Sequence, residues 1–155
     1  MIIETALLTD LEAILALQKL AYISEAELCN DYTIPPLLQT LEEIIAEYSQ
    51  KTFLKAVEIA TGRIIGSVRA NVHNDTCYIG RLIVHPDYQN RGIGTKLLQS
   101  IEGYFQDGCK RYELFTGQKS IKNIYLYEKF GYRIFKEEKV SDKLTFVYLE
   151  KYWQI

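Results

Sequence analysis

The chain has 155 residues, of which 48% are hydrophobic and 25% are charged, so residues 1–155 are expected to form one globular domain with a buried core. The formal net charge of −2 excludes the general basic field that proteins binding nucleic acid use. No apolar run approaches the ~20 residues needed to span a bilayer, so no membrane partner is expected.

The first part of the chain predicts one strand, two helices and three further strands. Residues 2–8 form the strand, and a helix then starts at Thr9 or Asp10, because either side chain can cap it before leucines and isoleucines recur at helical spacing. A polar connection over residues 24–35 precedes a second helix over residues 37–48. Three strands follow, joined by turns at Thr61-Gly62 and Asn74-Asp75, over residues 52–60, 63–73 and 76–85.

The second part predicts two more helices and three more strands. The helices cover residues 92–107 and 120–130, and the strands cover residues 110–116, 132–139 and 144–151. The element order is therefore β-α-α-β-β-β-α-β-α-β-β. This order favours an α/β (α+β) fold in which helices flank a mixed, mostly antiparallel sheet.

The junction of the central strand and the helix after it has the composition of an anion site. Pro86 ends the strand, because proline cannot donate to a sheet ladder. Gly92 and Gly94 have no Cβ, so a ligand can approach the backbone closely where the free N–H groups of the first helical turn point outward. Arg91 adds a positive charge suited to phosphate oxygens. The stretch predicts a pyrophosphate site.

Two well-known phosphate-binding patterns do not fit this stretch, and a third does. A P-loop requires Lys directly after the second Gly, where Thr95 stands, and a dinucleotide fingerprint requires a third Gly, where Leu97 stands. Gln89-x-x-Gly92-x-Gly94 instead resembles the pyrophosphate motif of the GNAT superfamily of acyl-CoA N-acetyltransferases. The resemblance implies that acetyl-CoA contacts the following residues: Gln89, Asn90, Arg91, Gly92, Ile93, Gly94 and Thr95. It also places the backbone of Leu82, Ile83 and Val84 against the pantetheine arm.

A second segment resembles the same family. Residues 123–132 match its N-x-x-x-Y-x-x-x-G-[FY] pattern. The resemblance implies that Asn123 contacts pantetheine and that the Tyr127 hydroxyl is the acid for the leaving thiolate. Many relatives carry Asn where Ser120 stands, so the contact belongs to either Ser120 or Asn123. The other tyrosines of this helix are expected to pack.

The sequence indicates the acceptor site and the general base less clearly than it indicates the acetyl-CoA site. Glu25, Glu27 and Asp31 lie with Tyr32 in the polar connection, where they either attract a cationic amine or form a solvated loop. Some family members carry a Glu on the central strand where Tyr78 stands here, so no dedicated carboxylate base is expected there.

Other polar residues suit a structural role better. His73 and His85 are more simply structural, although His73 and Glu113 are the first suspects if a base exists. Lys119, Lys122 and Lys129 are expected to be solvated, although each could reach the 3′-phosphate of coenzyme A. No metal site is expected.

The resemblance as a whole implies an enzyme that moves the acetyl group of acetyl-CoA to a primary amine, either a small molecule or a peptide amino group. Two alternatives stay open: transfer of a longer acyl group, and an acyl-CoA-binding sensory module without turnover. Three cysteines without framework spacing indicate reduced thiols in a cytoplasmic protein. A homodimer paired through the strand Leu144–Lys151 is a further expectation.

Overall fold

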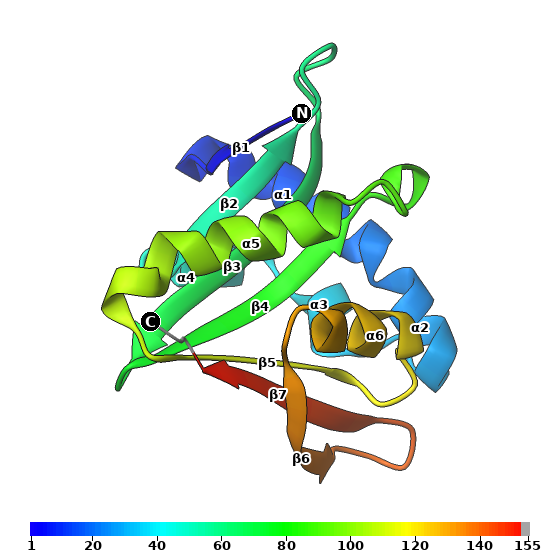
Figure 1. The fold of residues 1–155 in the computed structure, drawn as a ribbon. Helices are drawn as coiled ribbons and strands as arrows, with labels where there is room; N and C mark the ends of the chain where they lie inside the picture. Colours follow the sequence, from blue (N-terminus) through cyan, green and yellow to red (C-terminus); the bar gives the residue numbers. More distant parts are fainter. Residues whose placement is uncertain (153–155) are drawn as a thin grey trace.

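The computed structural model describes residues 1–152, so the last three positions of the expected domain lie outside the described residues. In the described part, seven strands form one sheet in the order β1-β2-β3-β4-β5-β7-β6 (Figure 1). Only β4 and β5 are parallel, and every other neighbouring pair is antiparallel. The expected fold class, a mostly antiparallel sheet flanked by helices, is confirmed.

The region between the first two strands holds more helix than the sequence predicts. Its elements are β1 (Ile2–Thr5), α1 (Leu11–Ala21), α2 (Ile23–Cys29), α3 (Pro35–Leu38), α4 (Leu41–Tyr48) and then β2 (Thr52–Val57). No helix was predicted in the polar connection over residues 24–35, but α2 occupies half of it. Only Ala26 and Cys29 of α2 are buried, which is too short a stripe to reveal a helical period.

The helix predicted over residues 37–48 is interrupted at its fourth residue. Thr40 has an extended backbone (φ −93°, ψ 163°), and its hydroxyl accepts from the Glu43 N–H while the Glu43 carboxylate accepts from the Thr40 N–H. This reciprocal pair is a capping box, which starts a new helix. The preceding helix, α3, begins with Pro35 in its first turn, where proline is tolerated.

The rest of the chain follows the predicted order. It contains β3 (Ile64–His73), β4 (Thr76–Val84), α5 (Ile93–Phe105), β5 (Arg111–Gly117), α6 (Ile121–Lys129), β6 (Arg133–Lys139) and β7 (Thr145–Tyr152). The predicted strand over residues 52–60 ends early, at Val57. The chain turns there, since the Gly62 N–H donates to the Glu58 carbonyl.

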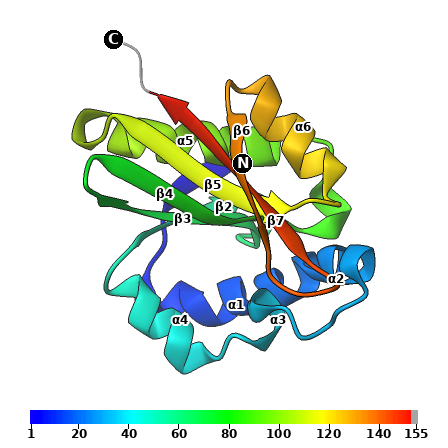
Figure 2. The ribbon, with the colours of Figure 1, turned by 90° about the horizontal axis from the view of Figure 1, so that it is seen from below.

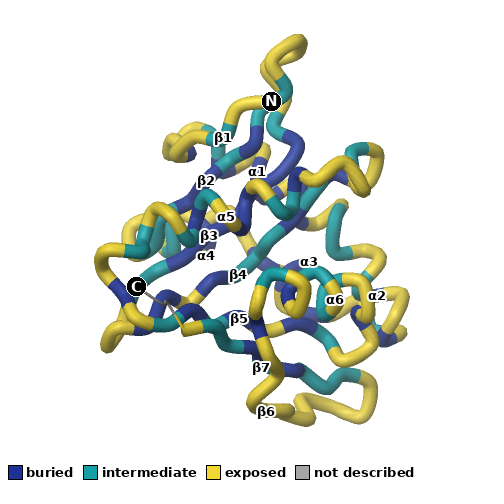
Figure 3. Tube along the Cα trace, viewed as in Figure 1, coloured by how far each residue is buried: buried dark blue, intermediate teal, exposed yellow. Residues whose placement is uncertain are grey.

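Helices cover both faces of the sheet (Figure 2). α1 to α4 lie on one face, and α5 and α6 lie on the other. Two separate apolar clusters hold these layers, one in which Leu97, Leu98 and Ile101 of α5 pack against the strands and one in which Leu11, Ile14 and Ile44 do so from α1 and α4. Figure 3 shows that burial is concentrated along the central strands, whereas β6 is exposed along its length.

The parallel pair of strands separates after three residues. β4 and β5 pair at Thr76↔Arg111, Cys77↔Tyr112 and Tyr78↔Glu113, and no later residue of β4 pairs with β5. Figure 1 shows the two strands starting together and diverging. On its other side β4 stays paired with β3, but the register shifts between Ser67 and Arg69. The sheet is therefore open between β4 and β5.

The C-terminal strand does not offer a free edge for a dimer. β7 pairs with β5 on one side and with β6 on the other over most of its described length. The expected pairing of Leu144–Lys151 across a dimer is therefore wrong, because its backbone hydrogen bonds are already made within the chain. Whether the protein forms a homodimer by another surface stays a prediction. No helix among the described residues is long and apolar enough to cross a membrane.

Candidate active site

A cavity of about 1060 Å³ lies where β4 and β5 separate. Residues of α2, β4, the start of α5, β5, α6 and β7 line it. The cavity thus joins segments from both ends of the chain. Most of the residues that the sequence singles out meet at this one place.

The start of α5 forms one end of the cavity. Gly92 precedes the helix with φ +79°, a left-handed conformation that glycine adopts at least cost. The first N–H that bonds back into the helix is that of Lys96, to the Gly92 carbonyl at 3.1 Å. The N–H groups of the preceding turn are therefore outside the helical ladder, as an anion site requires.

Six of the seven residues in the predicted pyrophosphate motif line the cavity. They are Gln89, Asn90, Gly92, Ile93, Gly94 and Thr95. Arg91 is the exception, because its exposed guanidinium lies over the Tyr88 ring, 5.1 Å from the ring centroid, outside the lining residues. A Cβ built on Gly94 would lie 3.8 Å from both Leu126 and Val84, which are ordinary van der Waals contacts. Other parts of the protein therefore leave room for a ligand beside the Gly94 backbone.

The edge of β4 forms a long wall of the cavity. Leu82, Ile83 and Val84, which are predicted to lie against the pantetheine arm, all line it. Because β4 has no partner on the β5 side after Tyr78, the backbone polar groups on that edge are not used by the sheet. An extended ligand arm can take the place of the missing strand.

Tyr127 reaches the cavity from α6 and is 5% exposed. Burial raises the pKa of its hydroxyl, and the nearby Tyr22 and Glu25 raise it further. The hydroxyl therefore keeps its proton at physiological pH, as a proton donor must.

Ser120 and Asn123 both contact the same carboxylate. The Ser120 hydroxyl donates to Glu25 Oε1 at 2.8 Å, and Asn123 Nδ2 donates to the same oxygen at 3.2 Å. Asn123 also donates to Thr116 Oγ1 at 3.3 Å. Both side chains therefore face Glu25 and line the cavity, and which of them contacts pantetheine stays a prediction. This contact ties α2 to α6.

The predicted acidic cluster is divided. Glu25 and Glu27 line the cavity, whereas Asp31 and Tyr32 do not. Asp31 accepts from the Thr33 N–H and hydroxyl, which lower the pKa of its carboxyl, and Tyr32 is exposed. Asp31 and Tyr32 follow the end of α2 at Cys29, so the structure does not bring them to the cavity with Glu25 and Glu27, and a role of any of the four in acceptor binding stays a prediction.

None of the base candidates named from the sequence lines the cavity. His85 is held by the Asp87 N–H at Nδ1 and by Arg63 at Nε2, both at 3.0 Å. His73 is exposed at the far end of β3, and Glu113 pairs with Arg111 at 2.9 Å. Among described residues, Glu25 and Glu27 are the only carboxylates that line the cavity. No group of metal-ligating side chains is found in the described part of the chain.

Among the lining residues that the sequence analysis did not single out, two bear on the charge of the cavity. Tyr22 lies between α1 and α2, and Arg81 lies at the irregular part of β4 with its guanidinium carbon 5.9 Å from the Tyr22 ring centroid. Burial raises the pKa of Tyr22, and Arg81 opposes this shift. No local pattern marks Tyr22, but an arginine within an apolar strand is a signal, because such a charge is rarely buried without a role.

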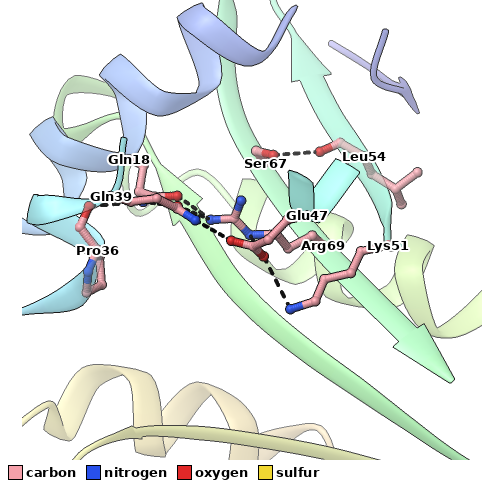
Figure 4. Close-up of polar contacts among 8 residues, drawn as sticks. All are labelled: Gln18, Pro36, Gln39, Glu47, Lys51, Leu54, Ser67 and Arg69. Atoms are coloured by element: carbon pink, nitrogen blue, oxygen red, sulfur yellow. Dashed lines mark hydrogen bonds and ion pairs between the residues drawn. The ribbon is translucent and has the colours of Figure 1, made fainter. Parts of the chain in front are cut away.

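A buried polar cluster fixes the helices under the site (Figure 4). Arg69 of β3 is 2% exposed and bonds Gln18 of α1, which donates to the Pro36 carbonyl at 3.0 Å and to Gln39 at 2.9 Å. Glu47 of α4 lies 3.6 Å from Arg69 Nε. The cluster connects α1, α3 and α4 to the sheet, and α1 leads directly to Tyr22.

Comparisons of the sequence agree with this arrangement. Residues 11–132 match the model of the Acetyltransferase (GNAT) family. Over 133 residues, 84% of this chain, the sequence is 32% identical to the UPF0157 protein YqkA of Bacillus subtilis (strain 168). Over 74 residues, 47% of the chain, it is 32% identical to the uncharacterized protein YdhI of the same organism. The chain spans only 37% and 45% of the lengths of these relatives.

Solved structures share the fold at low sequence identity. The ribosomal-protein-S18-alanine N-acetyltransferase of Escherichia coli superposes with a TM-score of 0.79 and 17% identity, covering 99% of this chain and 94% of that one. The PaiA N-acetyltransferase of Thermoplasma acidophilum, solved with coenzyme A, has a TM-score of 0.77 and 20% identity, covering 99% and 100%. YncA of Salmonella typhimurium, solved with acetyl-CoA, has a TM-score of 0.78 and 17% identity, covering 100% and 95%. With the family model matched over residues 11–132, the chain belongs to the GNAT acetyltransferase family.

Proposed function

We propose that this protein transfers the acetyl group of acetyl-CoA to a primary amine by direct attack on the thioester. The observation that carries the proposal is the opening between β4 and β5, which has the uncapped start of α5 at one end and Tyr127 on its wall. Two structural neighbours, PaiA and YncA, were solved with coenzyme A and acetyl-CoA, which supports the choice of co-substrate.

The residues of the cavity suit the parts of this co-substrate. The N–H groups at the start of α5, with Gln89 and Asn90 beside them, suit the pyrophosphate. The unpaired edge of β4 at Leu82, Ile83 and Val84 suits the amide groups of pantetheine. Arg91 lies outside the lining, so its contribution is proposed as a peripheral charge near the phosphates.

The reaction needs three contributions from the chain. A neutral amine nitrogen forms a bond to the carbonyl carbon, and the C–S bond then breaks. A backbone N–H of β4 is proposed to stabilise the oxyanion. Tyr127 is proposed to give its proton to the departing thiolate, since burial keeps that hydroxyl protonated. The proton lost by the amine passes to water or to Glu25.

The proposal also covers the class of acceptor, the domain organisation and the cellular location. The acceptor is a small amine or a peptide amino group, reached from the side of the sheet on which α2 and Glu25 lie. Residues 1–155 are proposed to act as one cytoplasmic acetyltransferase domain, which fits the unpaired state of all three cysteines.

The test measures release of coenzyme A thiol from acetyl-CoA in the presence of a panel of amines. Amine-dependent release above the rate with water alone is expected for at least one acceptor class. In parallel, calorimetry measures the affinity of the protein for acetyl-CoA, hexanoyl-CoA and coenzyme A. Binding of acetyl-CoA without release for any amine would contradict the proposal and favour a sensory module, whereas faster release from hexanoyl-CoA would favour a longer acyl group.

A further inference from the structure

Three of the six arginines are not exposed, and they differ in their partners. Arg69 lies beside Glu47, and Arg111 pairs with Glu113 and Glu150 at 2.9 Å. Arg81 has no carboxylate within 4.0 Å among the described residues, and its nearest recorded contact is the Tyr22 ring. A partly buried cation is normally paired, because removing it from water is costly. Arg81 is therefore an unneutralised charge at the cavity wall.

The backbone of Arg81 is also unusual. Its φ of +50° is left-handed, which non-glycine residues adopt only at an energetic cost. The residue lies at the register shift between β3 and β4, just after β4 leaves β5. The bulge removes Arg81 from the regular alternation of the strand and sends its guanidinium toward Tyr22. Such strain persists only where the surrounding structure holds the backbone in place, so the position of the Arg81 side chain is fixed by the fold.

The surroundings of Arg81 favour an anion. Burial lowers the pKa of Arg69 to about 10, and the charge of Arg81 contributes to this shift against the opposing effect of Glu47. Tyr22 lies within electrostatic reach of both Arg81 and Glu25. Glu25 uses Oε1 for Ser120 and Asn123, and its Oε2 has no recorded hydrogen bond in the described residues.

We propose that Arg81 binds an anionic group of the acceptor, and that the acceptor is a primary amine carrying a carboxylate, as a free amino acid does. This inference rests on the proposed function. The carboxylate lies against Arg81 in a charge-assisted hydrogen bond, and the amine lies toward Glu25 and the thioester. Four apolar side chains, Leu28, Phe115, Leu144 and Phe146, also line the cavity, so part of its wall suits an apolar side chain on the acceptor.

The test compares three acceptors with the same phenethylamine skeleton: L-phenylalanine carries a carboxylate, L-phenylalaninamide carries a neutral amide, and phenethylamine carries neither. The wild-type kcat/KM, expressed per neutral amine, is expected to be about 10- to 100-fold higher for the amino acid, the range that a hydrogen bond to a charged group supplies. Arg81→Gln is expected to bring this ratio close to one, and Arg81→Lys is expected to retain part of it. Arg133→Gln is the matched control, since Arg133 is exposed on β6 and does not line the cavity.

Binding is measured beside turnover, so that failure of the inference differs from failure of the proposed function. Calorimetry of L-phenylalanine with the protein loaded with coenzyme A should show binding that Arg81→Gln weakens at least tenfold, with acetyl-CoA affinity and circular dichroism unchanged. If no amine releases thiol but this binding is present and depends on Arg81, the function fails and the inference stands. Equal kcat/KM for the three acceptors in the wild type, or no binding of the amino acid, would overturn the inference.

Discussion

At the scale of single residues, the proposed chemistry depends most on Tyr127. Its hydroxyl is buried beside Tyr22 and Glu25, and it lies in the cavity rather than in the core alone. Tyr127→Phe keeps the ring and removes only the proton donor. We expect kcat to fall by roughly the 10²–10⁴ that general acids contribute, with acetyl-CoA affinity little changed. Steady-state kinetics and calorimetry measure the two quantities.

The control for this substitution is Tyr104→Phe. Tyr104 is 57% exposed on α5 and does not line the cavity, so removal of its hydroxyl should leave kcat within a factor of about two. A Tyr127→Phe variant that is as active as this control would show that Tyr127 only packs.

The pH dependence follows from what lines the cavity. Neither His73 nor His85, both in the described part of the chain, lines it, and burial raises the pKa of Tyr127 above its ordinary value, so that its hydroxyl stays protonated from pH 7 to 9. With an alkylamine of pKa near ~10.4, kcat/KM should rise about tenfold per pH unit from 7 to 9, because only the neutral amine attacks. With a peptide α-amino group, of pKa about 7.7–8.0, the rise should level off near that value. Neither profile should decline below pH 10.

A pH–rate profile for each amine tests this expectation. A plateau at one shared pH below 7.5 would instead reveal a basic group of the enzyme.

At the scale of elements, the proposed pyrophosphate site at the start of α5 can be tested by adding a small side chain to Gly94. Gly94 lines the cavity, and an added Cβ meets only ordinary contacts at 3.8 Å, so Gly94→Ala and Gly94→Val should fold. The side chain then occupies space where the pyrophosphate approaches the backbone. We expect acetyl-CoA affinity, measured by calorimetry, to fall at least about tenfold for Gly94→Val and less for Gly94→Ala.

The same helix provides a matched control. A Cβ on Gly103 meets nothing within 4 Å, so Gly103→Ala should leave acetyl-CoA affinity unchanged and stabilise the helix by about 0.5–1 kcal/mol. Unchanged affinity in Gly94→Val would place the pyrophosphate elsewhere.

The elements that the sequence predicts well are those with a strong local signal. The apolar strand ended by Pro86 and the helix begun at Gly92 are both found, because periodicity and glycine placement act locally. The helix α2 is missed, since it buries little and its contacts are made by Glu25 with residues about 95 positions away. The break at Thr40 was readable from Thr40-x-x-Glu43, a capping-box pattern that the apolar period obscured.

The site could likewise be predicted only in part from the sequence. The residues proposed to bind the co-substrate, at the edge of β4 and the start of α5, follow from local motifs and from family resemblance. Arg81 and Tyr22 come together only through the bulge of β4 and the packing of α1, which no local pattern encodes.

At the scale of the whole molecule, the Arg69 cluster joins the helical layer to the sheet. Arg69 is nearly inaccessible, and its Nε and Nη1 have no hydrogen-bond partner among described residues, so its charge relies on Glu47 at 3.6 Å. Burial raises the pKa of Glu47, but Arg69, Gln39 and Lys51 outweigh it and hold that pKa below its usual range. The cluster therefore stabilises the fold while Glu47 is ionised.

Glu47→Gln removes that charge and leaves Arg69 buried without compensation. We expect the free energy of unfolding at pH 7, measured by urea denaturation, to fall by about 1–3 kcal/mol, less than for a fully buried pair because the Glu47 side chain is 24% exposed. The wild type should lose this contribution as pH falls from about 4.3, the pKa of an unfolded Glu, through the lower folded pKa, because the carboxylate must then accept a proton. The variant lacks that group, so the difference between the two proteins should shrink over the same interval.

Glu42→Gln on the same helix is the control, since Glu42 is exposed and has no recorded ion pair among described residues. It removes only a first-turn charge that interacts with the helix dipole, so its free energy of unfolding at pH 7 should fall by no more than about 0.3–1 kcal/mol. Equal stability of Glu47→Gln and Glu42→Gln at pH 7 would mean that Arg69 is held by its amide partners alone. In that case the helical layer would owe its attachment to the apolar cluster of α1 and α4.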